Sequence, residues 1–283
     1  MSLERLRRAI ERLNRQPLPA TASAGRVRPA AVEAPSVSLA HLVQGTVVEG
    51  LGGRFYRITR RVSQCWHGDP GLGRRFCQAV SLAGARPGGL DPDLAGPLGA
   101  GPEALLFLDL ETCGFAATPV FLVGTMRVEG GDLVVEQLLA RSYEEEPAIV
   151  REFARLHGLR PALVSFNGKS FDWPFLRDRA AVSGVPLPDP ELHCDLLHVC
   201  RRRYRDRLPD CRLQTLERHV CRRRRVGDLP GSEIPGVYHE FVRTGDARLL
   251  REAVHHNFLD LVTLADLLSD AIGPTARRPP PGA

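Results

Sequence analysis

The chain has little lysine, few aromatic residues and no long hydrophobic segment. Lys169 is the single lysine among 283 residues, so arginine carries nearly all of the positive charge behind the formal net charge of +5. No run approaches the roughly 18 apolar residues that a membrane-spanning helix needs. Residues 1–15 are charged and amphipathic, unlike a signal peptide. These absences lead us to expect a cytoplasmic protein with no membrane partner.

Cysteine usage gives no sign of disulfides or of a metal–thiolate site. The seven cysteines are odd in number, and no pair has the C-x-x-C spacing. Four of them lie within Cys194–Cys221, but their spacing fits no usual zinc or iron–sulfur pattern. Hydrophobic residues make up 43% of the chain, which is ample for a sizeable core. We therefore expect a globular protein in a reducing compartment.

Composition divides the chain into four parts. An amphipathic helix at Leu3–Asn14 precedes a stretch rich in Pro and Ala, and the C-terminus is again rich in Pro. The predicted parts are an N-terminal helix and linker at 1–36, a small β-rich extension at 37–101, a main domain at 102–273 and a disordered tail at 274–283.

The predicted extension contains two short strands and a long loop. Gly45–Val48 and Arg54–Val62 have the composition of strands, and the two glycines between them favour a hairpin turn. Ala83–Gly101 is rich in Gly and Pro, which is typical of a loop.

The main domain is predicted to be a mixed α/β sheet flanked by helices. Two glycines within Glu129–Asp132 indicate a tight hairpin, which makes the strands around it antiparallel neighbours. A βββαβα order is not that of a doubly wound fold. The predicted elements are strands Leu105–Glu111, Val120–Val128 and Leu133–Ala140, helix Glu145–His157, strand Ala162–Phe166, and helices Phe171–Val182, Leu213–Cys221 and Arg248–Leu268.

Two carboxylates end the first strand of this domain. Asp109 and Glu111 follow the apolar run Leu105–Leu108 and project from the same face, because residues two apart on a strand point the same way. Like charges at the end of a buried strand repel each other, and a divalent cation with oxygen ligands would compensate them. A strand that runs out into solvent explains the same pattern without a metal.

A second carboxylate stretch follows a later strand. Asn167, Lys169 and Asp172 lie between the predicted strand Ala162–Phe166 and the helix after it. Asp172 either caps that helix or contributes to a site. Lys169 either contacts a phosphate or is solvated, and Asn167 either orients a substrate strand or closes the turn.

The third stretch lies on the last predicted helix. His256 and Asp260 are four residues apart and share a helix face, close to the apolar side where an unpaired carboxylate would be costly. A surface His–Asp pair is the alternative interpretation for this stretch alone.

Together, the three stretches resemble the DEDD superfamily of ribonuclease H-like 3′–5′ exonucleases. Asp109 and Glu111 match the first exonuclease motif, and Asp260 matches the aspartate of the third. The second motif, N-x-x-x-F-D, is matched by Asn167, Phe171 and Asp172.

Within that superfamily the chain resembles the YprB-like ribonuclease H-like domains, over roughly Leu51–Leu268. The resembling segments are Cys194–Glu217, Gly227–Ala247 and His256–Asp260. The resemblance implies a ribonuclease H-like fold and a nuclease that hydrolyses phosphodiesters with two divalent ions, Mg²⁺ or Mn²⁺. The implied metal ligands are Asp109, Glu111, Asp172 and Asp260.

The resemblance also implies a catalytic base just before Asp260. The tyrosine variant of the superfamily uses the position that His256 occupies here, four residues before the aspartate, and the histidine variant uses that of His255. Helix geometry favours His256, because four residues nearly close a turn and five do not. We keep His255 as the second candidate.

Two arginine runs are candidates for contact with phosphates. The first comprises Arg201, Arg202, Arg203 and Arg205, with Tyr204 available to stack on a base, and the second is Arg222–Arg225. Solvated helix faces are the alternative. The sequence therefore predicts a metal-dependent 3′–5′ exonuclease acting on single-stranded DNA or RNA 3′ ends. The alternative is a weak or inactive nucleic-acid-binding module that uses the arginine patches.

Overall fold

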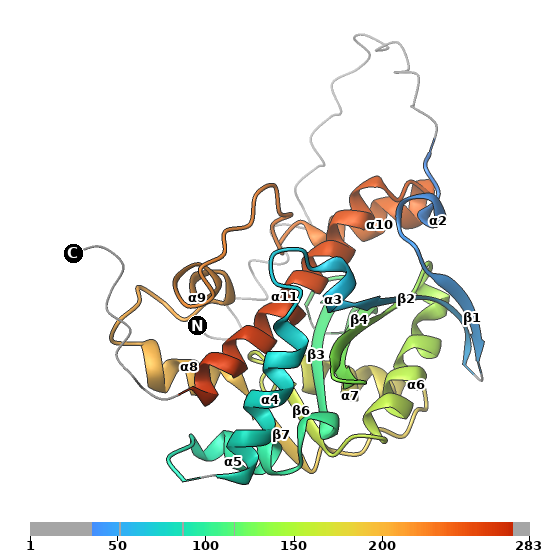
Figure 1. The fold of residues 1–283 in the computed structure, drawn as a ribbon. Coiled ribbons are helices and arrows are strands. Elements are labelled where there is room, and N and C mark those ends of the chain that lie inside the picture. The colour runs from blue at the N-terminus through green and yellow to red at the C-terminus, as the bar shows by residue number, and fades with distance from the viewer. Residues whose placement is uncertain (1–35, 51, 87, 116, 274–283) are drawn as a thin grey trace, which may run out of the picture. The chain divides into compact units, whose positions relative to one another are not determined.

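Seven strands form one mixed sheet with helices on both faces in the computed structural model of the chain (Figure 1). The description covers residues 36–50, 52–86, 88–115 and 117–273. The strands are β1 (Thr46–Gly50), β2 (Gly53–Arg61), β3 (Leu105–Thr112), β4 (Val120–Glu129), β5 (Asp132–Leu139), β6 (Ala162–Ser165) and β7 (Leu192–Asp195). The predicted helix at Leu3–Asn14, the linker and the C-terminal tail lie outside the described residues.

Helices cover both faces of this sheet. They are α2 (Leu39–Leu42), α3 (Val62–Cys65), α4 (Leu72–Ala85), α5 (Pro92–Gly99), α6 (Glu146–His157), α7 (Asp172–Val182), α8 (Leu196–Tyr204), α9 (Leu213–His219), α10 (Ile234–Thr244) and α11 (Arg248–Ile272). Within the described residues, none of them is long and apolar enough to cross a membrane. The cytoplasmic location stays a prediction.

The sheet combines an antiparallel half with a parallel half. The strand order is β1-β2-β5-β4-β3-β6-β7, and β1 to β3 are joined by antiparallel ladders while β6 and β7 add in parallel to β3. Gly130 and Gly131 between β4 and β5 have φ of 63° and 76°, as the central residues of a type I′ hairpin turn require. The predicted fold class, a mixed α/β sheet flanked by helices, is confirmed.

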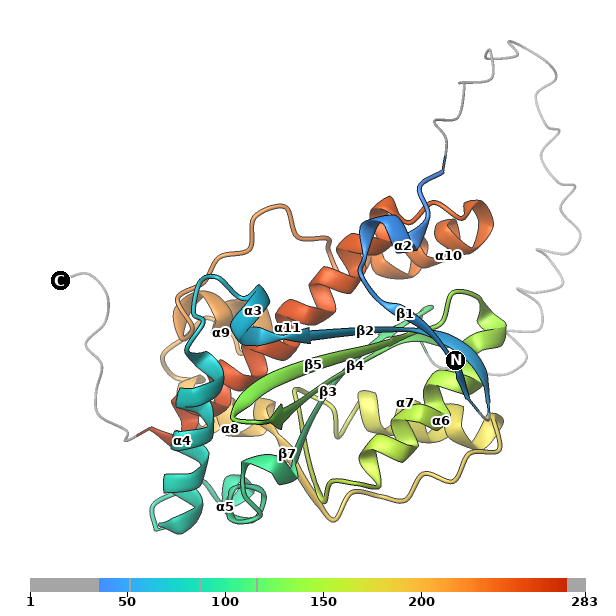
Figure 2. The ribbon, with the colours of Figure 1, turned by 45° about the vertical axis from the view of Figure 1, so that its right-hand side comes forward.

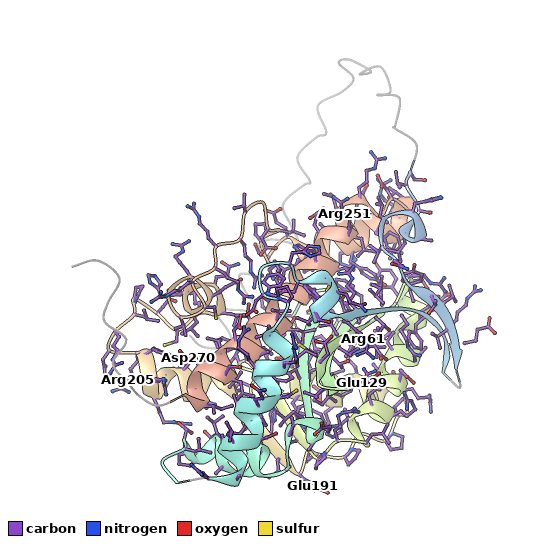
Figure 3. The ribbon with its side chains drawn as sticks, in the orientation of Figure 1. Arg61, Glu129, Glu191, Arg205, Arg251 and Asp270 are labelled. Atoms are coloured by element: carbon purple, nitrogen blue, oxygen red, sulfur yellow. The ribbon has the colours of Figure 1, made fainter. Side chains whose placement is uncertain are left out.

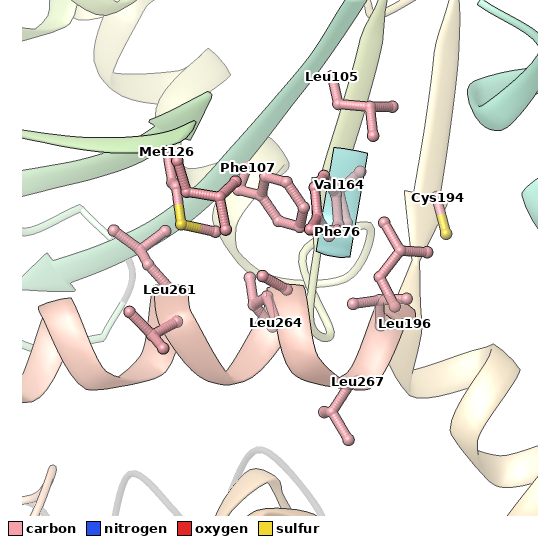
Figure 4. Packing of buried hydrophobic residues seen from close by; sticks show 14 of the residues in the cluster. Phe76, Leu105, Phe107, Met126, Val164, Cys194, Leu196, Leu261, Leu264 and Leu267 are labelled. Carbon is pink, nitrogen blue, oxygen red and sulfur yellow. The ribbon is translucent and has the colours of Figure 1, made fainter. Parts of the chain in front are cut away.

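Side chains of β3 alternate between two apolar cores. Leu105 and Phe107 join the core on the face covered by α4 and α11, whereas Leu106, Leu108 and Leu110 join the core beneath α6 and α7 (Figure 2). In the first core, Leu261 and Leu264 of α11 face Met126 and Phe107 of the sheet (Figure 4). This alternation carries Asp109 and Glu111 onto the α11 face.

The predicted loop at Ala83–Gly101 is wrong. The segment contains the end of α4 and all of α5, whose first turn is capped by Asp91 and begins with Pro92. Gly84 is needed for close packing of the two helices, since a Cβ there would lie 2.3 Å from the carbonyl oxygen of Leu98. Gly and Pro here serve helix packing and helix initiation, which composition alone did not reveal.

The predicted β-rich extension at 37–101 is β-structured only in β1 and β2, which continue the main sheet because β2 pairs with β5. The residues of this predicted extension belong to the same compact unit as the strands that follow them. The elements β7, α8 and α10 were not predicted either. All seven cysteines are free.

Candidate active site

Two acidic side chains of β3 lie beneath α11 at the carboxyl end of the strand. Asp109 pairs in register with Gly124 of β4, and Gly124 pairs with Gln137 of β5. Both Asp109 and Glu111 are half-buried on the face that α11 covers. The predicted projection of the two carboxylates from one face agrees with this arrangement.

Asn257 of α11 fixes the position of Asp109. Its Nδ2 donates to Asp109 Oδ2 at 2.7 Å and to the Asp109 carbonyl oxygen at 3.2 Å, and its Oδ1 accepts from Gln137 Nε2 at 2.8 Å. The Asn257 side chain lies directly over Gly124, where an added Cβ would be 2.1 Å from Oδ1. A glycine at position 124 is therefore what allows the fully buried amide to span three strands.

Two further residues of α11 face the same region. His256 is buried, and its Nε2 lies 3.4 Å from Oδ2 of Asp260, one helical turn later. On the other side of the ring, Nδ1 lies 3.0 Å from the carboxylate of Asp228. The imidazole is thus held between two aspartates, one from its own helix and one from the loop before α10.

That loop also supplies an arginine to Asp260. Arg225 is ion-paired with Asp260 through Nη2, with Glu217 through Nε at 2.6 Å and with Asp228 through Nη1 at 3.0 Å. Its side chain is only 8% exposed, so three carboxylates hold the guanidinium in one place. Asp260 is therefore bound by a protein cation in this structure.

Asp172 enters the site from the first turn of α7. The preceding loop turns sharply at Asn167, which has φ of 63°, and at Gly168, where a Cβ would lie 2.2 Å from Ser165 Oγ. The fully buried Asp195 fixes this loop by accepting hydrogen bonds from the backbone N–H groups of Asn167 and Lys169, at 2.7 Å and 3.1 Å. The parallel pairing of β3 with β6 brings the loop beside the carboxyl end of β3.

The four carboxylates influence one another electrostatically. Burial and the charges of the other three raise the pKa of Asp109 well above its usual range. Burial raises the pKa of Glu111 to about 8 and that of Asp172 to about 7. Burial acts in the same direction on Asp260, but the hydrogen bond with His256 and the charge of Arg225 outweigh it and lower that pKa.

His256 responds to the same charges in the opposite direction. Burial alone would lower its pKa, but the hydrogen bond with Asp260 and the charges of Asp260, Glu111 and Asp228 raise it to about 9. The imidazole is thus protonated at neutral pH beside Asp260, whose lowered pKa keeps that carboxylate charged.

The donor chemistry of the cluster fits a hard divalent cation. Asp109, Glu111, Asp172 and Asp260 offer only oxygen, and burial, with a smaller contribution from the neighbouring carboxylates, raises the pKa values of the first three. Within the described ranges, no group of three or more His, Cys, Asp or Glu side chains has the arrangement of a metal site. One of the four carboxylates, Asp260, is instead engaged by Arg225.

Three members of the first arginine run make their contacts away from this site. Arg202 pairs with Asp91 and Asp93, and Arg203 lies 3.5 Å from Asp270. The Tyr204 hydroxyl donates to Asp270 and its ring packs against the core, so the ring is not presented for stacking. Asp270 lies near the end of α11 beside α8 (Figure 3), ten residues or about 15 Å along the helix from Asp260.

Other predicted residues are placed as follows. Asn167 and Lys169 are exposed at the loop before α7. His255 is exposed and stacks on Phe258, with ring centroids 6.3 Å apart, on a different side of α11 from His256.

Asn257, Arg225 and Asp228 were assigned no individual role from the sequence. Arg225 and Asp228 belong to the segment R-V-G-D-L-P-G, whose glycines and proline are typical of a loop but do not show which part of the protein it packs against. Asn257 lies on the same helix, directly after His256 and three residues before Asp260. A buried amide needs hydrogen-bond partners, so an asparagine near the apolar side of this helix was a sequence signal for a polar contact.

Comparison with known proteins agrees with this fold. The RNase_H superfamily matches residues 106–272, which is more than half of the chain, so the chain belongs to the ribonuclease H superfamily. The chain is also similar to the uncharacterized protein YprB of Bacillus subtilis (strain 168), with 34% identity over 168 residues. That match covers 58% of this chain and 40% of YprB, so the chain spans well under two thirds of its relative.

Among solved structures, the chain is similar to the family B DNA polymerase of the hyperthermophilic archaeon Pyrobaculum calidifontis. The TM-score is 0.41 and the identity 19%, over 58% of this chain and 24% of the polymerase chain. The predicted resemblance to YprB-like ribonuclease H-like domains is confirmed by the family match and by the identity to YprB. The DEDD subtype stays a prediction.

Proposed function

We propose that the chain is a divalent-metal-dependent 3′–5′ exonuclease that hydrolyses phosphodiester bonds at single-stranded DNA or RNA 3′ ends. The observation that carries the proposal is the gathering of acidic side chains from β3, α7 and α11 around the end of β3, where burial and the charges of neighbouring carboxylates raise the pKa values of Asp109, Glu111 and Asp172. Membership of the ribonuclease H superfamily supports the same class of chemistry.

In this proposal, Asp109, Glu111, Asp172 and Asp260 hold two ions, Mg²⁺ or Mn²⁺. When bound, the two ions supply activation of the attacking water and neutralisation of charge on the leaving oxygen. Asn257 keeps Asp109 in place through two hydrogen bonds, and Asp195 keeps the loop before Asp172 in place. Arg225 must give up Asp260 for that carboxylate to become a ligand.

His256 is the proposed base. Asp228 accepts from Nδ1–H, which leaves the Nε2 atom on the side of Asp260 and fixes the useful tautomer of the neutral ring. Its raised pKa comes from the surrounding carboxylates, so neutralising them lowers that pKa towards the range in which imidazole accepts a proton. The exposed His255 forms no hydrogen bond or ion pair with a carboxylate of the described residues and remains the second candidate.

The experiment uses purified protein with 5′-labelled single strands of DNA and of RNA, in Mn²⁺, Mg²⁺ or EDTA. An Asp109→Ala protein purified in the same way controls for contaminating nuclease. The proposal expects a metal-dependent ladder of shortened 5′-labelled products that is absent from the variant. A ladder obtained with only one of the two kinds of strand would identify DNA or RNA as the substrate.

A second candidate function is a nucleic-acid-binding module that does not cleave. The Asp260–Arg225 ion pair favours it, because an arginine occupies a carboxylate that the metal site needs. Salt-sensitive binding of single strands without cleavage in any of these metals would support the module and contradict the enzyme.

A further inference from the structure

A pocket of about 390 Å³ lies beside the carboxylate cluster, lined by α9 and by the loop between α9 and α10. This loop runs along α11 in Figure 1. The pocket shares a wall with the site, because two of its lining residues, Arg225 and Asp228, are the ones bonded to Asp260 and His256. A molecule in the pocket would thus be one side chain away from the candidate catalytic residues.

The charge that this pocket presents is positive. Two of its arginines, Arg223 and Arg225, are neutralised by neighbouring carboxylates, of which Glu217 is only 3% exposed. The other two, Arg218 and Arg224, are exposed and make no hydrogen bond or ion pair with any described residue. The arginines of the pocket without an acidic partner are therefore the exposed ones, and the compensated arginines are partly buried.

The chemistry and size of the pocket suit phosphate groups. Arginine binds a phosphate oxygen pair with its planar fork, and a volume of this size is in the range of pockets that hold small ligands. A Cβ added at Gly227 or at Gly231 would meet no atom within 4 Å, so the backbone there is open to close approach. Apart from Leu229 and Pro230, the side chains of the lining are polar or charged.

We propose that this pocket, which we call the α9–α10 pocket, binds the phosphodiester backbone of the strand whose 3′ end is processed at the carboxylates. The inference rests on the proposed function and adds where the strand runs. Arg225 links the two places, since it is ion-paired with Asp260 and lies in the pocket wall, where a phosphate would compete for it. Two of the three arginines of α8, Arg202 and Arg203, already have acidic partners.

The test compares two double variants that each remove two exposed arginines. Arg218→Ala with Arg224→Ala alters the pocket, and Arg201→Ala with Arg205→Ala is the matched control on α8 and just after it. Binding of a 5′-fluorescein-labelled single strand is measured by anisotropy in EDTA over a range of salt. The pocket variant is expected to bind about tenfold more weakly at low salt, with a salt slope smaller by about 1.4, since each single-strand phosphate contact contributes about 0.7.

The control variant is expected to stay within about twofold of the wild type, and thermal melting confirms that both variants fold. Equal weakening by the two variants, or no weakening by the pocket variant, would overturn the inference. Calorimetric binding of a nucleoside monophosphate that needs Arg218 and Arg224, with unchanged strand binding, would also overturn it and assign the pocket to the product.

Wild-type cleavage in Mn²⁺ is measured separately, so that the two proposals fail independently. If the wild type cleaves but the pocket variant binds strands normally, the pocket proposal is rejected and the nuclease proposal is retained. If the pocket variant binds strands more weakly but the wild type does not cleave, strand binding in the pocket is supported and the nuclease proposal is rejected.

Discussion

Two aspartates of α11, Asp260 and Asp270, are both paired with arginines from elsewhere in the chain, yet they lie in different surroundings. Asp270 meets Arg203 and Tyr204 of α8 near the surface and ties two helices together. Asp260 meets Arg225 and His256 beside three other acidic side chains, with which no arginine of the described residues forms an ion pair. An arginine–aspartate pair is thus structural near the C-terminal end of the helix and part of a charged site at the middle of the helix.

The largest expected effect comes from neutralising each aspartate in turn, which tests whether the two ion pairs differ in role. Asp260→Asn should lower the proposed exonuclease activity by about 10³-fold, the upper end of the cost of losing one preorganised electrostatic group. Asp270→Asn should leave activity within about twofold and reduce stability by about 1 kcal/mol or less, as for other exposed ion pairs. Cleavage of 5′-labelled strands and urea unfolding measure the two effects, and equal activity loss in both variants would contradict the comparison.

The next effect concerns how Asp109 is held. Asn257→Ala removes the donor to Asp109 and the partner of Gln137, and should weaken Mn²⁺ binding and activity by about 10–100-fold, as loss of such supporting hydrogen bonds does at metal sites. Thr263→Ala is the matched control, since Thr263 is equally buried in α11 but contacts Arg223.

Asn257→Ala is measured by calorimetric titration with Mn²⁺ and by cleavage rate. A rate loss as large in Thr263→Ala would show that helix stability, rather than Asp109, is the cause. Gly124→Ala should act in the same direction as Asn257→Ala, because its methyl group would displace the amide.

The acidic cluster also predicts how stability depends on pH without metal. Glu111 and Asp172 have folded-state pKa values of about 8 and 7, above their ordinary values near 4, so the folded protein binds more protons than the unfolded chain between these limits. The raised pKa of His256, about 9, acts the same way above pH 6.5. The free energy of unfolding in EDTA should therefore fall as pH rises from 5 to 8.

Urea unfolding at pH 5 and pH 8 measures this slope, and Mg²⁺ or Glu111→Gln should flatten it. A free energy of unfolding that rises with pH over this range in EDTA would contradict the raised pKa values of Glu111 and Asp172.

The last prediction concerns the loop before α7. Asp195→Asn replaces an acceptor of backbone N–H groups with an amide that can accept through one oxygen only, and should destabilise the protein by about 1–3 kcal/mol. The measurement is urea unfolding. Asp206→Asn, at an exposed position, is the control and should change stability by less than about 0.5 kcal/mol.

Part of this arrangement follows from the sequence and part does not. The apolar run of β3 and the i, i+4 spacing of His256 and Asp260 depend only on local periodicity, so their faces were predictable. The partners of Asp260 and Asp109 come from residues up to 148 positions away, as with Asn257 and Asp109, and no local rule reports such contacts.

The two arginine runs show the same limit. Both look alike in the sequence, but Arg202 meets acidic residues 109 and 111 positions earlier, while Arg225 folds onto α11. Charge runs predict that a surface is basic, whereas the three-dimensional partners decide which of the charges remain free. The helices α4 and α5 were missed for a related reason, since Gly84 and Pro92 serve packing and capping that composition does not distinguish from a loop.

The most direct test of the central claim is a calorimetric titration with Mn²⁺ of the wild type, Asp260→Asn and Asp270→Asn at pH 7.5. We predict that the wild type and Asp270→Asn bind two ions per chain with release of protons, and that Asp260→Asn binds fewer or more weakly. Binding that is the same in all three proteins, or absent from the wild type, would contradict the assignment of these carboxylates to a divalent cation.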